Sequence, residues 1–309
     1  MRGARGGSGR LTDALVRVIE AHGGTVVCDR RVVGLVLEDG RCAGVETEDG
    51  ERWLAREAVV SNIHVKHLLG MADAWPEDFR YGVETFDVGI PAFVVYLATS
   101  APPVFETPQG PRSAVSAGTA GWPEDLVHAC REIRDGRFVP ETPWLLAATP
   151  TLADPERAPE GHHTIKLITP QGSSPPPGTA SWPDARDAYA RTLIDGLRRV
   201  APGLTDDVIL ASLVRSPPDI EAANPHMIDG TFHGGDRGIP FSGALRPAPG
   251  WAQHRMPIPG LYQTSGTTHP GGSITGGPGR NAAIVILQDF GTSLEEVVEG
   301  ADRPRAGRL

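Results

Sequence analysis

The chain has 309 residues, of which 39% are hydrophobic and 22% charged, a composition typical of a globular protein with one or two domains. Its 29 basic and 38 acidic residues give a formal net charge of −9 and include no long basic block, which argues against nucleic acid as the partner. The 38 glycines and 29 prolines indicate many ordered loops.

The first 62 residues predict a helix followed by an antiparallel meander. Apolar residues recur at helical spacing over residues 11–19, and Gly23-Gly24 supplies the stop. Asp39-Gly40 and Asp49-Gly50 are strong hairpin signals, and they separate strand-like runs. The strand-like runs are "TVVC", "RVVGLVLEDG", "RCAGVETEDG" and "ERWLAREAVVSN", the last of which ends in the apolar strand "AVVSN".

The middle of the chain predicts a second sheet and a helix of its own. Its strand-like runs are "AFVVYLAT" (92–99), "WLLAAT" (144–149), "TIKLIT" (164–169) and "DVILASLV" (207–214). The helix is expected in "SWPDARDAYARTLIDGLRRVAPG", where Ser181 and Asp184 form a capping-box pair. We therefore expect this section to be a domain inserted into the first one.

The last section, "PIPGLYQTSGTTHPGGSITGGPGRNAAIVILQDFG", predicts a strand, a glycine-rich turn and a buried helix. Gly277-Pro278 suits the helix start, because proline has no N–H to lose at the first helical position. Glycines and a positive helix end can form an anion-binding site, whereas the alternative is a tight packing turn. The turn by itself does not decide between these two interpretations.

The cysteines and the hydropathy indicate neither a disulfide framework, nor a metal site, nor a membrane span. The three cysteines are widely spaced without a CxxC motif, so they predict reduced thiols rather than a disulfide framework or a zinc site, and no metal is expected. No apolar stretch reaches the roughly 18 residues that span a bilayer. We expect a cytoplasmic protein without a transmembrane segment.

The C-terminal section closely resembles the flavin-binding signature of the phytoene-dehydrogenase-like FAD-dependent oxidoreductases. That family includes carotenoid desaturases, retinol saturase and related pyridine-nucleotide-disulfide-oxidoreductase-domain proteins. Three further blocks resemble it in the same order, so that the resemblance runs from Gly6 to about Gly291. These blocks are "GGSGRLTDALVRVIEAHGGTVVCDRRVVGLVLEDGRCAGV", "EAVVSNIHVKHLL" and "DGTFHGGDRGIPFSGALRPAPGWAQHRMPIPGLY".

The resemblance implies an α/β chain with the two-domain FAD-dependent oxidoreductase fold of the glutathione-reductase-like and amine-oxidase-like enzymes. Family members begin with a strand–GxGxxG–helix unit that holds the FAD pyrophosphate, and this sequence contains no GxGxxG. Either the N-terminal dinucleotide-binding βαβ unit lies on a partner chain, or the chain is a truncated form. Residues 1–70 and 251–295 would form part of the FAD-binding domain, 71–250 the substrate-binding domain, and 296–309 a flexible tail.

The resemblance also implies which residues contact FAD. The residues that would line the ribityl side of the flavin are Gly266, Thr267 and Thr268. Those that would bring the positive end of the last helix to the isoalloxazine ring are Gly276, Gly277, Pro278 and Gly279. Val32 corresponds to a position whose backbone meets the adenine, with strand core as the alternative, and Asn62 ends the strand beside the cofactor.

The catalytic candidate is His269, which lies inside the signature near the expected meeting point of flavin and substrate. Its ordinary pKa would allow acid–base catalysis, and the alternative is that it only fixes the turn by hydrogen bonding. His226 and His233 lack carboxylates at metal-ligand spacing and are expected to be structural. Arg246 is expected to pair with a carboxylate of the other domain rather than with the substrate.

The resemblance implies hydride transfer at flavin N5, in a dehydrogenase, desaturase or saturase reaction. The substrate is expected to be lipophilic or a small organic molecule. The strand "AFVVYLAT" and its sheet would offer the substrate an apolar wall. A flavin-dependent non-redox isomerase and a non-catalytic subunit or remnant are the alternatives. No GxSxG, HExxH or P-loop motif supports hydrolytic, zinc or nucleoside-triphosphate chemistry.

Overall fold

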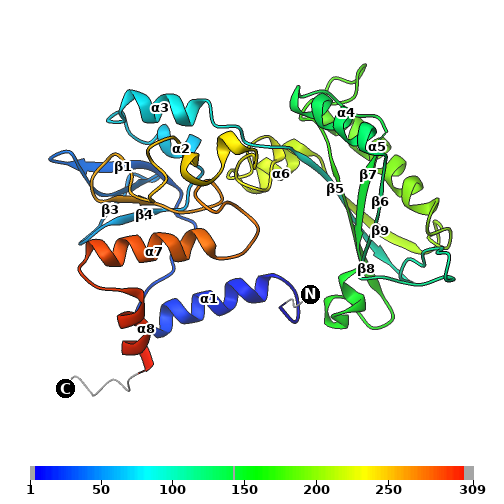
Figure 1. Ribbon diagram of the computed structural model, residues 1–309. Helices are drawn as coiled ribbons and strands as arrows, with labels where there is room; N and C mark the ends of the chain where they lie inside the picture. The colour runs from blue at the N-terminus through cyan, green and yellow to red at the C-terminus, as the bar shows by residue number, and fades with distance from the viewer. Residues whose placement is uncertain (1–3, 142, 303–309) are drawn as a thin grey trace. The chain divides into compact units, whose positions relative to one another are not determined.

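The computed structural model describes residues 4–141 and 143–302 and divides the chain into two compact units (Figure 1). Unit 1 contains the residues up to Cys28 together with Ile90–Thr231. Unit 2 contains Asp29–Gly89 together with the residues from Phe232 onward. The chain thus changes unit at other points than the predicted boundaries at residues 70 and 250. The assignment of one part to FAD and the other to substrate stays a prediction.

Unit 1 is built on a five-stranded antiparallel sheet with the strand order β6-β7-β8-β5-β9. Its strands are β5 (Ala92–Thr99), β6 (Ser116–Ala120), β7 (Trp144–Ala148), β8 (His163–Pro170) and β9 (Ile209–Arg215). The four strands predicted in this section are confirmed. The sequence of β6, "SAGTA", contains no large apolar residue, and it was not predicted because pairing with β7 and not its own composition makes it a strand.

The core of unit 1 lies between this sheet and α5 (Trp182–Arg198). Ser181 is the N-cap residue of α5, but the predicted capping box is not formed: the Ser181 side chain makes no hydrogen bond to the helix backbone, and its Oγ donates to Asp184 Oδ2 at 2.7 Å instead. Buried residues recur along the helix at the spacing of one face, and β5 contributes alternate side chains that are at most 2% exposed. These residues are Tyr189, Leu193 and Leu197 on the helix and Phe93, Val95 and Leu97 on the strand.

The other helices of unit 1 are α1 (Gly9–Ala21), α4 (Pro123–Arg134) and α6 (Pro217–Ala223). Helix α1 confirms the first predicted helix, but none of its residues is buried. The strand predicted at Thr25–Cys28 is wrong, because that segment has no regular secondary structure and leaves Val26 and Val27 exposed. A β-strand needs a hydrogen-bonding neighbour, and no described strand pairs with this segment.

Unit 2 contains the predicted antiparallel meander, β1 (Val32–Glu38), β2 (Arg41–Thr47) and β3 (Arg52–Leu54). The two predicted hairpins are confirmed. Asp39 and Gly40 both have positive φ, 49° and 76°, as a two-residue hairpin turn of the type I′ class requires. The turn chemistry of this dipeptide therefore sets the register of the first two strands.

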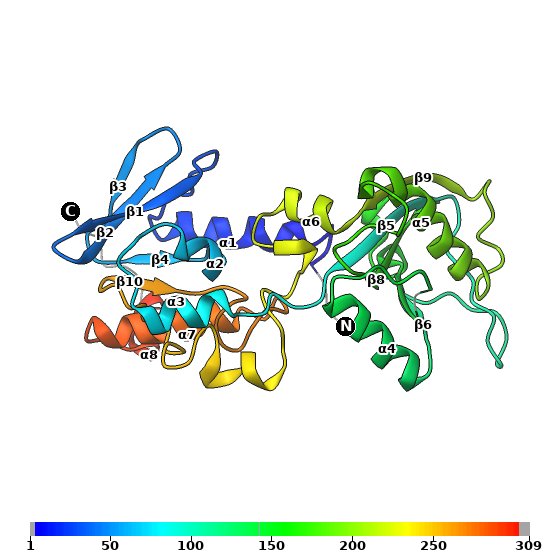
Figure 2. The same ribbon diagram turned by 90° about the horizontal axis from the view of Figure 1, so that it is seen from above.

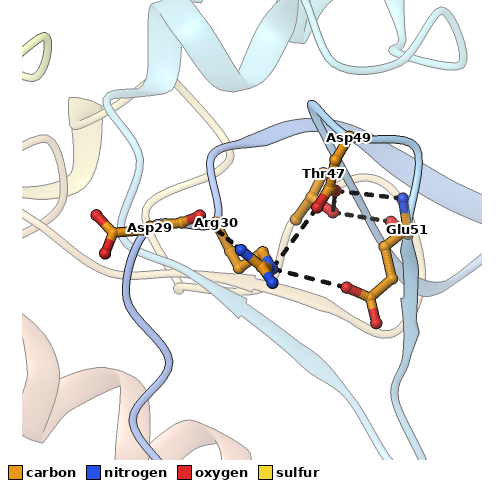
Figure 3. Close-up of polar contacts among 5 residues, drawn as sticks. All are labelled: Asp29, Arg30, Thr47, Asp49 and Glu51. Atoms are coloured by element: carbon orange, nitrogen blue, oxygen red, sulfur yellow. Dashed lines mark hydrogen bonds and ion pairs between the residues drawn. The ribbon is translucent and has the colours of Figure 1, made fainter.

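The second hairpin is held by side chains around Asp49 (Figure 3). Thr47 Oγ1 donates to Asp49 Oδ1 at 2.7 Å, and this bond, with smaller help from the Glu51 N–H and Arg30, lowers the pKa of the Asp49 carboxyl. Arg30 Nε lies 3.6 Å from Asp49 Oδ2 and 3.7 Å from Glu51 Oε2. These contacts attach the segment that precedes β1 to the β2–β3 turn.

The second sheet of unit 2 is a parallel pair, β4 (Val59–Ser61) and β10 (Leu261–Gln263), which run side by side in Figure 2. The helices of this unit are α2 (Val65–Leu69), α3 (Glu77–Glu84), α7 (Gly277–Asp289) and α8 (Leu294–Asp302). Figure 1 shows α2 and α3 on one side of the pair and α7 on the other. The core contains Leu68, Phe79 and Leu261, each at most 1% exposed.

Two expectations for the end of the chain are corrected. The apolar run from Ile284 to Leu287 is only half-buried, and the buried residues of α7 are Pro278 and Ala282. The predicted flexible tail begins inside α8, which is helical to Asp302, and residues 303–309 lie outside the described part. Among the described residues, none of the helices has the length and apolar character that a bilayer span requires.

Candidate functional site

The carboxyl ends of β4 and β10 lie at the same edge because the two strands are parallel. Thr264 N–H donates to Ser61 O at 2.8 Å, and Gln263 Nε2 donates to Ile63 O at 2.6 Å. These bonds hold the segment after β4 against the segment after β10. Ligands of open α/β sheets bind outside the carboxyl ends of the strands, so this edge is where a ligand is expected.

Buried polar side chains gather at this edge. Thr267 and Thr268 have no exposed surface, and Ser265 Oγ lies 2.7 Å from Thr267 Oγ1 and 3.1 Å from Thr267 N. Gln263 is also fully buried, and its Oε1 has no hydrogen-bond partner among the described residues. An unsatisfied buried acceptor costs about 1–3 kcal/mol, so this edge offers an acceptor that a ligand or a water could satisfy.

Packing within the chain explains why Gly266 is a glycine. A Cβ on Gly266 would lie 3.1 Å from His233 O, and a Cβ on Gly234 would lie 2.7 Å from the carbonyl carbon of Gly266. The two backbone segments therefore touch, and side chains would separate them. Gly266 needs no ligand to account for it.

At the entrance of α7, packing does not explain every glycine as it explains Gly266. Gly276 caps the helix at φ 70°, and Gly277 begins it close to Pro270, whose Cγ would lie 2.9 Å from an added Cβ. Gly279 is the third residue of α7, its φ is not in the left-handed region, and an added Cβ would meet nothing within 4 Å. Neither the backbone nor the packing of the described residues requires glycine at Gly279.

An unexplained glycine in a helix has an energetic meaning. Glycine destabilises a helix interior by about 0.5–1 kcal/mol relative to alanine. Gly279 is exposed and stands in the first turn, where backbone N–H groups lack helical partners and the helix dipole is positive. A group from outside the described residues that approaches the backbone here would account for the glycine.

The turn that leads into α7 also carries backbone strain. Ser273 and Ile274 have φ values of 126° and 57°, which non-glycine residues rarely adopt, and Ile274 is 90% exposed. A β-branched residue in the left-handed region is an outlier that costs of order 1–3 kcal/mol. Such strain is common at ligand-binding sites. The neighbouring glycines, which have no side chain to block a ligand, agree with a site here.

Arg246 holds this region together from inside. Its guanidinium donates to four backbone carbonyls, those of Gly234, Asp236, Phe241 and Gly266. Burial, helped by the nearby Arg237, lowers the pKa of Arg246 to about 10. The expected pairing with a carboxylate of another domain is therefore wrong, because carbonyls of its own unit occupy the guanidinium. Its partners come from loops that fold together, which a sequence pattern cannot show.

His269 lies beside a second histidine that the sequence did not single out. Both line a cavity of about 390 Å³, together with Gln253, Asn281, Ile284 and others. His254 is buried, and Nδ1 of its ring lies 3.0 Å from Gln263 O, which can only accept, so Nδ1 carries the proton. Burial, and then the neighbouring His269, lower the pKa of His254. A single histidine in a loop, "AQHR", gave no signal for this pairing.

The remaining predicted residues lie apart from one another. Asn62 is exposed and follows β4 directly, beside the polar edge that Ser61 and Gln263 form. Val32 is half-buried at the start of β1, where it pairs with Thr47. No hydrogen bond of the described residues connects Val32 to the glycine-rich turn, so the structure brings Asn62 to the candidate site and not Val32.

Comparison with known proteins shows what this chain is similar to. No family model matches the chain. Pyridine nucleotide-disulfide oxidoreductase domain-containing protein 2 of Mus musculus is 28% identical over 300 residues, which cover 93% of the chain and 51% of that protein. A limonene dehydrogenase subunit of Castellaniella defragrans is 26% identical over 322 residues, with 94% of the chain and 56% of that protein covered. Carotenoid desaturases are also similar in sequence.

The chain is a homologue of the phytoene-dehydrogenase-like FAD-dependent oxidoreductases. This confirms the family that the sequence blocks indicated. An oxidoreductase from Methanosarcina mazei shares the fold, with 16% identity and a TM-score of 0.53 over 93% of this chain and 55% of that one. The predicted α/β fold class is confirmed. The chain spans about half the length of the curated relatives that it matches.

Proposed function

We propose that this chain is the carboxyl-terminal part of a FAD-dependent oxidoreductase and that the flavin ring binds at the entrance of α7. The observation that carries the proposal is Gly279, a helical glycine in a bare first turn that nothing in the described chain requires. FAD, when bound, would take a hydride from a substrate C–H or C–N bond, or supply one in the reverse direction. The homology to flavin-dependent dehydrogenases and desaturases supports this reaction class.

The residues of the chain fit a flavin in two ways. The first turn of α7 offers the N–H of Gly279 and the positive end of a 13-residue helix, which favour an electron-rich group. The Gly277 N–H already donates to Thr275 Oγ1, and Pro278 has no N–H. The polar edge offers the unsatisfied Oε1 of Gln263, whereas the hydroxyls of Thr267 and Thr268 are fully buried and already hydrogen-bonded to Ser265. The residues that would hold the flavin part of FAD are Gly266, Thr267, Thr268, Gly276, Gly277, Pro278 and Gly279, with Asn62 as a further contact. Val32, which lies apart from them, would meet the adenine at the other end of the cofactor.

The pyrophosphate of FAD would be held by residues outside these 309. A GxGxxG unit is missing from the sequence, and the chain covers about half of its curated relatives. That unit would come from another segment of the same polypeptide or from a partner chain. One relative is a subunit of a limonene dehydrogenase, but the chain covers only 56% of that subunit, so this relative does not favour either arrangement. An isolated pair of parallel strands, with Val60 half-exposed, also favours further strands beside β4.

His269 is proposed as the residue that moves a proton during substrate oxidation. Its side chain is exposed in the cavity, and its ring makes no hydrogen bond with the described residues. His254, held by Gln263 O and buried, would stay neutral beside it and leave Nε2 as an acceptor. The substrate is proposed to be lipophilic, because the sheet of unit 1 presents apolar residues on the face away from α5.

The test is anaerobic reduction of the flavin. The chain, supplied with the dinucleotide-binding unit and FAD, is mixed with lipophilic alkenes and terpenoids, and the flavin absorbance is followed. Bleaching by a substrate, reversed by an electron acceptor, supports an oxidoreductase. Conversion of a substrate without net electron transfer to an acceptor would instead indicate an isomerase. Failure to bind FAD at all would indicate a non-catalytic subunit.

A further inference from the structure

The sheet of unit 1 has one open face whose composition is unusual. Side chains of β5 with odd numbers face α5, so the even-numbered residues of β5, together with their cross-strand partners, lie on the opposite face. The registers place two rows of residues across all five strands. One row is Gly118, Leu146, Ile168, Val94 and Arg215, and the other is Ser116, Ala148, Lys166, Tyr96 and Leu213.

This open face is apolar and partly exposed. Tyr96 and Leu213, which pair directly, are 40% and 52% exposed. Leu146 and Ile168, which also pair, are half-buried. With strands about 4.8 Å apart, five strands give a surface about 19 Å wide. An elongated apolar molecule could lie across this surface, whereas a compact polar substrate could not use it.

The only charged side chains in these two rows are cations. Lys166 lies centrally, with its Nζ 5.6 Å from the centre of the Tyr96 ring, and Arg215 lies at the end of the neighbouring row. Neither residue forms an ion pair with the described residues. The two rows contain no aspartate or glutamate, so no carboxylate within them neutralises the positive charge.

Lys166 is also exceptional in composition. The chain contains only two lysines, Lys66 and Lys166, against 27 arginines. Lys66 Nζ donates to Glu84 O at 2.7 Å in unit 2, whereas the described partner of Lys166 is an aromatic ring. A compact ammonium beside an apolar surface binds a carboxylate and also tolerates an aromatic neighbour.

We propose that this open face binds an elongated apolar carboxylic acid, with its carboxylate paired to Lys166 and its hydrocarbon body across Tyr96, Ile168 and Leu213. The acid is the substrate class of the enzyme, and that part of the inference rests on the proposed function. The binding site itself belongs to unit 1 and requires no flavin. Its presence can therefore be tested separately from the redox reaction.

The experiment measures binding of myristate and of myristyl alcohol to the full chain without FAD, by tryptophan and tyrosine fluorescence. The acid is expected to bind more tightly than the alcohol. The Lys166→Met variant should reduce the affinity for the acid by about three- to tenfold and leave the affinity for the alcohol unchanged. That range is typical of a half-exposed ion pair with a charge-assisted hydrogen bond. Lys166→Arg should keep most of the preference. Lys66→Met, the matched control, should change neither affinity.

Amine labelling provides a second readout on the same molecules. An acylating reagent followed by mass spectrometry should modify Lys166 less when myristate is present, and should modify Lys66 equally with and without it. Equal affinity for acid and alcohol, or a preference that survives Lys166→Met, would overturn the proposal. Flavin reduction by an uncharged terpene with no binding of the acid would reject this inference and leave the proposed function standing.

Discussion

Gly279→Ala separates the folding role of the α7 entrance from its ligand-binding role. The added Cβ meets no atom within 4 Å, and the backbone of Gly279 is not in the left-handed region, so alanine fits the structure as it stands. Replacing glycine by alanine in a compatible helix should then stabilise the chain by about 0.5–1 kcal/mol. For a unit of this size the melting temperature should rise by about 1–4 °C.

The same methyl group should weaken FAD binding. If the flavin ring contacts the backbone of the first turn of α7, a Cβ at position 279 occupies part of the space that the ring needs. We expect at least a tenfold loss of FAD affinity, about 1.4 kcal/mol, when the dinucleotide-binding unit is present. The assays are calorimetric unfolding without FAD and a flavin fluorescence titration with that unit.

Two variants of neighbouring glycines serve as controls. Gly272→Ala should destabilise the chain, because its Cβ would lie 2.5 Å from His233 O. Gly276→Ala should cost about 1–2 kcal/mol, because φ is 70° there, although its Cβ would also meet open space. If Gly279→Ala lowers the melting temperature, the space in front of the first turn of α7 is not empty. If it raises the melting temperature and FAD binds as before, the glycine is not kept for a flavin.

Three further variants test the elements around this site. Arg246→Lys should reduce the free energy of unfolding by about 2–4 kcal/mol, because an ammonium cannot serve four carbonyls in the geometry of a guanidinium, and denaturant titration measures the loss. Ile274→Asn should raise the melting temperature, since asparagine adopts a positive φ more readily than a β-branched residue; no change would show that the strain is absent. Arg255 and Tyr262 lower the pKa of Asp289 to about 2 from 3.8, so its carboxylate stabilises the chain above pH 3.8 and loses that effect as the pH falls toward 2. Asp289→Asn should therefore melt below wild type at pH 6, and the difference should vanish near pH 2; a constant difference would contradict the assigned pKa.

Local chemistry explains which elements the sequence predicts. Asp39-Gly40 specifies a hairpin through the φ values that its two residues accept, whatever the rest of the chain does. Ser181 stands at the N-cap of α5, where serine is favoured, and the buried spacing from Tyr189 to Leu197 then follows from the helical period. Such features need no knowledge of distant residues.

Contacts between distant segments explain what the sequence does not predict. Thr25–Cys28 has the composition of a strand and fails to form one, because strand pairing needs a neighbour that the described chain does not provide. The four carbonyl partners of Arg246 and the closeness of His254 to His269 depend on how several loops fold together. The glycine-rich turn was found because its residues are contiguous, but only the structure separates Gly266, which packing explains, from Gly279, which packing does not.

The most direct measurement is a crystal structure of the chain assembled with its dinucleotide-binding unit and FAD. We predict an isoalloxazine ring in contact with the backbone at Gly276–Gly279, with the ribityl chain along the edge formed by Gln263, Thr267 and Thr268. A flavin bound elsewhere, or protein side chains filling the space in front of Gly279, would contradict it.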